Sequence, residues 1–308
     1  MRIKSLASLL LFNICIFAGS LPFEIPKQKR LIAIGDIHGD FSVVKALLQK
    51  GGIVDHKMNW IAGDTTVVQV GDLLDRGPDE MKIINFLKKL EKQAIRAGGM
   101  LYVLQGNHEL KNVDLRFSDV TEEGFAQFEK YTINAPVNEL TKDVKKALED
   151  LPYYQHGRVM AFRPGGEIAK YLSTHHTILK VGETIFVHGG VEAKYAEKGL
   201  NKINSDISGW MNGTDRRRKY FFEEDSPLYS RLFAKTENKS CKQLDKALKI
   251  LGAKRMVIAH TVQKTINSDC DGKVWRIDTG MSSFYDGGGE LGFIEIIYDE
   301  KVKIHRFL

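Results

Sequence analysis

The chain has 308 residues, of which 43% are hydrophobic and 27% charged, as in ordinary soluble globular proteins. That length allows one large domain or two small ones with a proper core. The formal net charge of +6 is mild, and acidic residues are interspersed with the basic ones, so the charge suits an anionic substrate and we expect no nucleic-acid partner.

The first twenty residues differ from the rest. Arg2 and Lys4 precede an apolar run at 6–18, and Ala18-Gly19-Ser20 has the small residues of a cleavage site. This pattern predicts a secretory signal peptide at 1–20, and an uncleaved membrane anchor is the alternative. We therefore expect a mature single domain at 21–308 that is secreted or periplasmic, or lumenal in a eukaryote, without stable membrane insertion after cleavage.

Cys241 and Cys270 would remain after that cleavage. An exported protein could pair them, but the sequence alone does not show that they meet.

The first half of the mature chain alternates strands and helices. Short apolar runs at 31–34, 67–70 and 101–104 each read as a buried strand, and an amphipathic helix is expected after each of the first two. The second helix should start at Pro78, a residue favoured at the first helical position. This order is typical of a parallel, right-handed βαβ arrangement.

The second half interrupts this pattern with polar helical segments. Residues 115–172 are expected to form a helical cap insertion, and 191–251 a second helical segment. Further strands are expected at 184–187 and 256–259, and the tail at 275–307 alternates like antiparallel strands.

Each of the five predicted strands ends in possible metal ligands, and open α/β folds bind ligands at the carboxyl ends of their strands. In chain order these residues are Asp36 and His38, Asp72, Asn107 and His108, His188, and His260. They are oxygen and nitrogen donors without a thiolate, which favours a hydrolytic site over a structural zinc site. They are too many for one ion and suit two, with Asp72 as the shared ligand. Alone, each motif could be a helix cap, a turn or a satisfied core histidine, but five in this order make that interpretation improbable.

These motifs carry a resemblance. GDIHGD, GDLLDRG, GNHE, HGG and AHT, in that order, resemble the metallophosphoesterase core of the phosphoprotein phosphatases of the PPP superfamily. Longer segments, such as NWIAGDTTVVQVGDLLDRG and KVWRIDTGMSSFYDGGG, resemble the Shewanella-like protein phosphatases more closely. The resemblance implies an α/β fold, a layered calcineurin-like β-sandwich flanked by helices, with the helical cap insertion at about 115–172.

The resemblance also implies a role for each motif residue. One metal would be held by Asp36, His38 and Asp72, and the other by Asp72, Asn107, His188 and His260. His108 would be the general acid, oriented by Asp75, and Arg76 and Arg231 would bind the substrate phosphate. Two divalent ions are expected, Mn²⁺ foremost, with Fe or Zn²⁺ as alternatives. No counterpart is found of the C-terminal tyrosine-bearing loop that the serine/threonine enzymes place around the substrate.

The expected function is hydrolysis of phosphate monoesters on phosphorylated proteins or peptides, through direct in-line attack by a metal-bridging hydroxide. The resemblance implies a preference for phosphotyrosine and predicts no particular regulatory subunit. One alternative is a diadenosine tetraphosphate or small-metabolite phosphoesterase on the same core. Another is an inactive, metal-stabilised binding module.

Overall fold

The computed structural model describes residues 21–131, 140–235, 237–285 and 288–307. The predicted signal peptide at 1–20 lies outside them. Among the described residues, no helix is both long enough and apolar enough to cross a bilayer.

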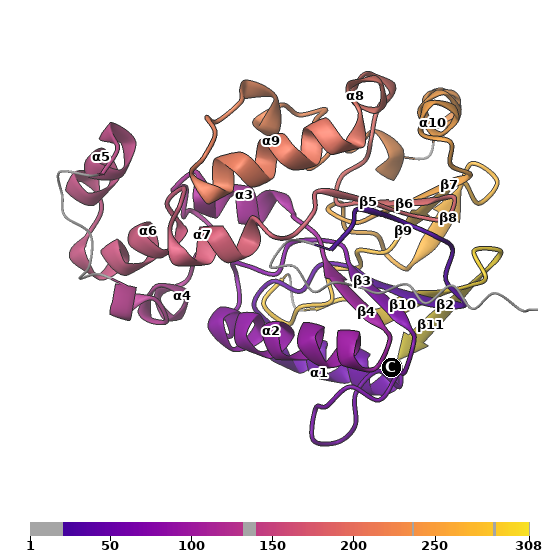
Figure 1. Cartoon of the computed structure of the whole chain (residues 1–308), viewed down its shortest axis with the longest axis horizontal. Coiled ribbons are helices and arrows are strands. Elements are labelled where there is room, and N and C mark those ends of the chain that lie inside the picture. The colour runs from indigo at the N-terminus through magenta and orange to yellow at the C-terminus, as the bar shows by residue number, and fades with distance from the viewer. Residues whose placement is uncertain (1–20, 132–139, 236, 286–287, 308) are drawn as a thin grey trace, which may run out of the picture.

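Two β-sheets form the centre of the molecule (Figure 1). The first sheet has the strand order β11-β10-β2-β3-β4, in which β2, β3 and β4 run parallel. Its strands are β2 (Arg30–Ile34), β3 (Thr66–Gln69), β4 (Met100–Val103), β10 (Leu291–Ile297) and β11 (Lys301–Phe307). Every residue of β3 is buried, as the predicted continuous apolar strand requires.

The second sheet has the order β1-β5-β6-β7-β9-β8, in which β6, β7 and β9 run parallel. Its strands are β1 (Glu24–Ile25), β5 (Ile178–Val181), β6 (Thr184–Val187), β7 (Arg255–Ile258), β8 (Asn267–Asp269) and β9 (Val274–Arg276). The prediction of an antiparallel tail is therefore right for β10 and β11, which pair with each other, whereas β9 pairs antiparallel with β8 on one side and parallel with β7 on the other.

Helices cover both outer faces of this two-sheet core (Figure 1). On the first sheet lie α1 (Phe41–Lys50) and α2 (Glu80–Arg96). On the side of the second sheet lie α8 (Ala193–Lys198), α9 (Leu200–Asn212) and α10 (Asn238–Leu251). The helix α1 begins where Asp40 accepts hydrogen bonds from the backbone of Ser42 and Val43. The helix α2 begins at Glu80, two residues after Pro78, so the predicted start is wrong by two residues.

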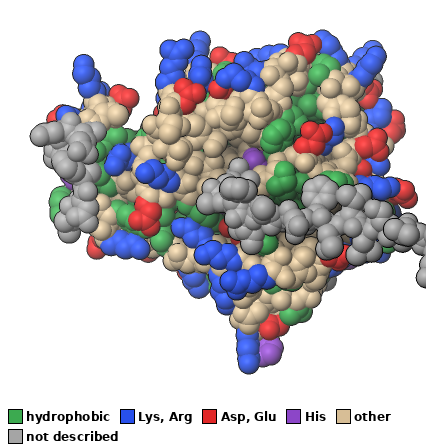
Figure 2. All heavy atoms as spheres, in the orientation of Figure 1, with side chains coloured by type: hydrophobic (Ala, Val, Ile, Leu, Met, Phe, Trp, Pro, Cys, Tyr) green, Lys and Arg blue, Asp and Glu red, His purple; other side chains and the backbone are tan. Residues whose placement is uncertain are grey.

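The described parts of the segment at 115–172 contain helices, as predicted. The segment contains α4 (Glu122–Ala126), α5 (Lys142–Asp150), α6 (His156–Phe162) and α7 (Glu167–Leu172) and follows α3 (Asn107–Val113). Four short 3₁₀ helices complete the described elements: η1 (Glu129–Tyr131), η3 (Tyr153–Gln155), η4 (Lys219–Phe222) and η5 (Leu232–Ala234). Figure 1 shows α4, α5 and α6 at the left edge of the molecule, far from β8 and β11. On the face shown in Figure 2, basic and acidic side chains are interspersed.

Cys241 of α10 and Cys270, just after β8, form a disulfide bond. The pairing that the sequence leaves open is therefore present. The bond joins residues 29 positions apart, and closing a loop of that length should stabilise the fold by about 3–4 kcal/mol in the chain-entropy account.

We expect the Cys241→Ser/Cys270→Ser double variant to lose about that free energy of unfolding, measured by denaturant titration. A reductant should destabilise the natural chain similarly and leave the double variant unchanged. An unchanged denaturation midpoint in the double variant would contradict this expectation.

Candidate dimetal site

The predicted ligands converge where the carboxyl ends of strands from both sheets meet. The loops after β2, β3 and β4 carry Asp36, His38, Asp72 and Asn107, and those after β6 and β7 carry His188 and His260. All except His260, which is half-buried, are buried. Two clusters of ligand atoms share Asp72: one with His38 and His108, the other with His188 and His260.

The first cluster lies around His38. Its Nε2 atom is 3.9 Å from Asp36 Oδ2 and 3.8 Å from Asp72 Oδ2. Its Nδ1 atom donates to the backbone oxygen of Leu74 (3.0 Å), which directs the Nε2 lone pair toward the two carboxylates. Burial lowers the pKa of His38 to about 4, so the imidazole is neutral, as a metal ligand must be.

The second cluster lies around His188. Its Nε2 atom is 3.2 Å from Asp72 Oδ2 and 3.0 Å from Asn107 Oδ1. Its Nδ1 atom donates to the backbone oxygen of Val70 (2.9 Å), so this ring is oriented in the same manner. The ring of His260 lies 4.9 Å from that of His188, and burial together with the His188 charge lowers the pKa of His260.

The charges of the pocket fit a pair of cations. Asp36 Oδ1 is buried and has no hydrogen-bond partner among the described residues. Burial, with the charges of Asp278 and Asp72, holds the pKa of Asp36 well above its ordinary value. Burial alone would raise the pKa of Asp72 too, but His188 and His108 hold it well below the ordinary value, so this central carboxyl is ionised. A buried, mutually repelling carboxylate set with oriented imidazoles is a donor set for divalent ions.

Several of these residues adopt a backbone conformation that non-glycine residues rarely take. His38, Asp72, Asp75, Arg76 and His260 have φ angles from 47° to 69°. Such conformations cost about 1–3 kcal/mol each and persist where the surrounding structure enforces them, commonly at functional sites. The backbone of these loops therefore takes a locally unfavourable conformation that places the site side chains.

Glu109, the last residue of GNHE, fixes the loop that carries Asp72. Its carboxylate accepts hydrogen bonds from the backbone of Gly106 (2.6 Å), Asp72 (2.9 Å) and Leu73 (2.9 Å). Glu109 is not among the residues predicted from the sequence, although it directly follows two that are, Asn107 and His108.

His108 and Asp75 form the predicted pair. His108 Nδ1 donates to Asp75 Oδ2 at 2.6 Å, and His108 Nε2 lies 3.8 Å from Asp72 Oδ2. Burial lowers the pKa of His108, but the charge of Asp72 and the hydrogen bond to Asp75 outweigh it and raise this pKa. The imidazole is therefore able to hold a proton beside the two metal-ligand clusters.

The two predicted phosphate-binding arginines lie near different clusters, Arg76 near His38 and Arg231 near His260. The Arg76 guanidinium lies over the ring of Tyr285 (4.5 Å), and that ring stacks on His38 (5.5 Å). Arg231 Nη1 donates to Thr261 Oγ1 (2.9 Å) and to the backbone oxygen of His260 (3.3 Å). Tyr285 thus places a tyrosine from the C-terminal part of the chain beside His38 and Arg76.

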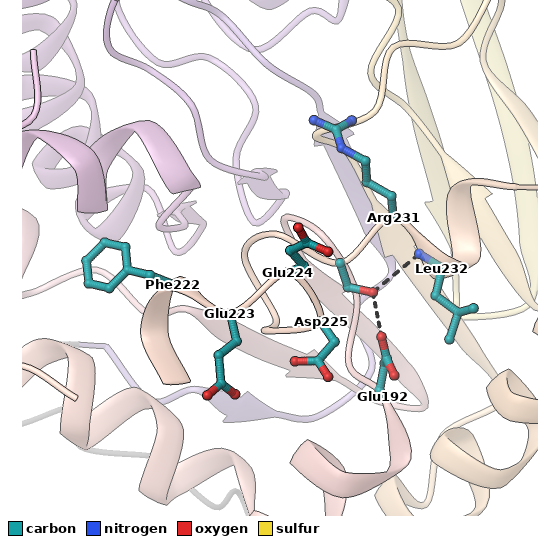
Figure 3. A pocket seen from close by; sticks show the side chains of 8 residues that line it. Glu192, Phe222, Glu223, Glu224, Asp225, Arg231 and Leu232 are labelled. Atoms are coloured by element: carbon teal, nitrogen blue, oxygen red, sulfur yellow. Dashed lines mark hydrogen bonds between the residues drawn. The ribbon is translucent and has the colours of Figure 1, made fainter. Parts of the chain in front are cut away.

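Arg231 borders a cavity of about 540 Å³, and four of the eight residues that line it are acidic. Figure 3 shows its guanidinium pointing away from Glu224 and Asp225. No carboxylate of the described residues forms an ion pair with it, and the two groups that it hydrogen-bonds are neutral. Its charge is thus available to an anion.

We expect Arg231→Ala to lower kcat/KM by roughly 10–150-fold, because hydrogen bonds to charged groups contribute about 1.5–3 kcal/mol. Steady-state kinetics on 4-nitrophenyl phosphate measures this, with the exposed Arg216→Ala as the matched control. Equal kinetics of the two variants would exclude Arg231 from substrate binding.

Asp278 is a further carboxylate that sequence analysis missed. It follows β9 by two residues and is buried, and its charge contributes to the raised pKa of Asp36. The pattern of an apolar strand followed by aspartate, which identified the other loops, is also present in WRIDTG.

The two-sheet core with ligands at its strand ends defines a metallophosphoesterase, and comparison with known proteins agrees. The family model for calcineurin-like phosphoesterases matches residues 29–264. The chain is 37% identical to Shewanella-like protein phosphatase 2 of Arabidopsis thaliana, over 92% of this chain and 79% of that protein. It is 31% identical to Shewanella-like protein phosphatase 1 of Plasmodium berghei, over 91% and 74%. The chain belongs to the calcineurin-like phosphoesterases and, among them, to the Shewanella-like protein phosphatase family.

The fold is also found in a solved structure. A cold-active protein-tyrosine phosphatase of a psychrophilic Shewanella species superposes with a TM-score of 0.68, at 24% identity, over 93% of this chain and 83% of that one. The predicted fold class is therefore confirmed. The individual roles of the ligands, His108, Asp75 and the two arginines remain predictions that the geometry allows.

Proposed function

We propose that this protein is a divalent-metal-dependent phosphoprotein phosphatase that hydrolyses phosphate monoesters and prefers phosphotyrosine, with Mn²⁺ as its metal. The observation that carries the proposal is the pair of ligand-atom clusters that share Asp72, one of which includes His108, whose other ring nitrogen is held by Asp75. Two relatives that match most of the chain carry the name of protein phosphatases.

Asp36, His38 and Asp72 would hold one ion, and Asp72, Asn107, His188 and His260 the other. Bound there, two divalent ions supply Lewis acidity and a nucleophilic water at neutral pH. A phosphate monoester is an anion that repels such a nucleophile, so its charge must be offset. Arg76 and Arg231 would bind the phosphate oxygens, which offsets their charge and orients the ester.

His108 supplies the proton that the leaving oxygen needs. Its Nε2 atom faces the clusters, because Nδ1 is held by Asp75. Asp75 keeps this tautomer and stabilises the protonated ring. The displaced side chain leaves as a neutral alcohol or phenol.

Aromatic side chains around the clusters support the proposed preference for phosphotyrosine. Tyr285 flanks His38, the ring of Tyr229 lies 6.2 Å from that of His260, and Phe284 is exposed beside Tyr285. A phenyl ring can pack against such surfaces, and a serine side chain gains little from them.

A substrate panel tests the proposal. Phosphotyrosine and phosphoserine peptides and diadenosine tetraphosphate are assayed with Mn²⁺, Fe²⁺ or Zn²⁺, and again with a chelator. We expect chelator-sensitive turnover that is highest on phosphotyrosine peptides with Mn²⁺. Turnover of the dinucleotide alone would overturn the proposal in favour of a dinucleotide hydrolase, and metal binding without turnover would indicate a binding module.

We also propose that the protein is exported. The N-terminal pattern supports this, and a disulfide such as Cys241–Cys270 persists in oxidising compartments. Mass spectrometry of the protein from its native source should find a mature N-terminus near Leu21, and an intact Met1 would contradict the proposal.

A further inference from the structure

Arg158 is a fully buried arginine that no motif identifies. It lies on α6, within the helical segment at 115–172, and its side chain is 0% exposed. Burying a guanidinium is costly unless all of its N–H groups are paired. Its partners therefore indicate what it does.

Arg158 binds the carboxylate that orients His108. Its Nη2 atom donates to Asp75 Oδ1 at 3.2 Å, on the oxygen opposite the one that accepts from His108. Its Nε atom donates to Asn112 Oδ1 (2.8 Å), and Asn112 Nδ2 in turn donates to Asp75 Oδ1 (2.8 Å). Arg158 thus fixes Asp75 both directly and through Asn112.

Glu80, at the start of α2, holds Arg158 in that orientation. Its two carboxylate oxygens accept from Arg158 Nη1 (2.5 Å) and Nη2 (2.9 Å), and Glu80 Oε1 also accepts from the backbone N–H of Asp75 (2.6 Å). The last Arg158 donor goes to the backbone oxygen of Gly124 (3.1 Å). A planar, bidentate contact of this kind fixes direction as well as distance.

Aromatic rings enclose the guanidinium. The rings of Phe162 and Phe128 lie 4.7 Å and 4.9 Å from Arg158 Cζ, and both side chains are fully buried. Arg158 and Asp75 are both buried, so water does not compete for their hydrogen bonds, and this network sets the position of Asp75.

We infer that Arg158 is a positioning residue for proton donation to the leaving group: through Asp75 it holds His108 in the orientation that the reaction requires. The inference rests on the proposed phosphatase function for its kinetic test. Through Arg158, the helical segment at 115–172 would help to orient the proton donor, although it supplies none of the predicted metal ligands.

The test separates positioning from simple stabilisation by changing the leaving group. The charge-matched double variant Arg158→Gln/Glu80→Gln removes the ion pair without leaving an unpaired buried charge. A displacement of about 1 Å in a catalytic group can cost roughly 100-fold, so we expect up to that loss in kcat on a phosphoserine peptide. On 4-nitrophenyl phosphate, whose leaving group needs no proton, we expect less than about a threefold change. Arg163→Gln, on the same helical segment, is the control.

A double-mutant cycle adds a second criterion. If Arg158 acts through His108, adding the double variant to His108→Asn should cause no further loss on the phosphoserine peptide. Multiplicative losses, or equal losses on both substrates, would overturn the inference. If the double variant does not fold, Arg158→Lys replaces it, because lysine keeps the positive charge but lacks the planar, bidentate guanidinium. This variant should also lose more activity on the phosphoserine peptide than on 4-nitrophenyl phosphate.

A measurement without substrate keeps this inference separable from the proposed function. The His108 Nδ1 proton, assigned by its absence in His108→Asn, should give a resolved downfield NMR signal in the natural protein. We expect it to broaden or shift in the Arg158 variants but not in Arg163→Gln. An unchanged signal would overturn the positioning role even if the enzyme had no phosphatase activity.

Discussion

Replacing Asp72 with asparagine is expected to remove metal binding and turnover together. Asp72 is the member common to both ligand clusters, and it is the carboxyl whose pKa the neighbouring histidines hold down. Loss of a hydrogen-bond partner of a ligand typically costs about 10–100-fold in metal affinity or activity, and loss of a shared ligand should cost more.

The measurement is metal stoichiometry after dialysis, together with kcat under saturating Mn²⁺. The thermal midpoint supplies a second reading, because an ion that binds only the folded state raises it. Mn²⁺ should raise the midpoint of the natural protein and leave that of Asp72→Asn unchanged. Asp64→Asn, at an exposed carboxylate paired with Lys29, is the matched control. If the Asp72→Asn variant still bound two equivalents of metal and kept the turnover of the natural protein, the dimetal site would be refuted.

His108→Asn should lower kcat on phosphoserine peptides by roughly 10²–10⁴-fold and on phosphotyrosine peptides by less. The reason is the leaving group: an alkoxide must be protonated as it departs, whereas a phenolate is stable enough to leave with less help. The hydrogen bond of His108 to Asp75, which sets its tautomer, supports this role.

Parallel assays of the variant on the two peptides, at saturating metal, measure this difference. Metal stoichiometry should stay at the natural value, which distinguishes loss of the acid from loss of an ion. Equal losses on the two substrates would show that His108 does not protonate the leaving group.

Much of the candidate site could be predicted because its residues follow strands. An apolar run that ends in aspartate or histidine is visible in one sequence, and parallel strands bring their carboxyl ends together, as with Asp36 and Asp72. The arginine at 158 carries no such signal. It lies in the helix sequence HGRVMAF, and only the packing of α6 against the loop of Asp75 gives it a role.

Tertiary contacts also override the local sequence preferences for where a helix begins and for backbone conformation. Pro78 is favoured at the first position of a helix, yet α2 begins at Glu80, where the carboxylate meets Arg158 and the backbone of Asp75. The left-handed backbone at His38, Asp75 and Arg76 is likewise imposed by contacts distant in sequence.

The division of the ligands between the two sheets bears on how the protein acquires activity. The loops after β2, β3 and β4 carry four of the six predicted ligands, and the other two arrive with β6 and β7, the first of which begins more than eighty residues after the end of β4. An N-terminal fragment that ended before β6 would lack His188 and His260 and could not complete the second ion's coordination. Catalytic activity should therefore appear late in folding. A nascent chain should stay inactive toward phosphoproteins until the second sheet has packed against the first, and a truncated chain should stay inactive throughout.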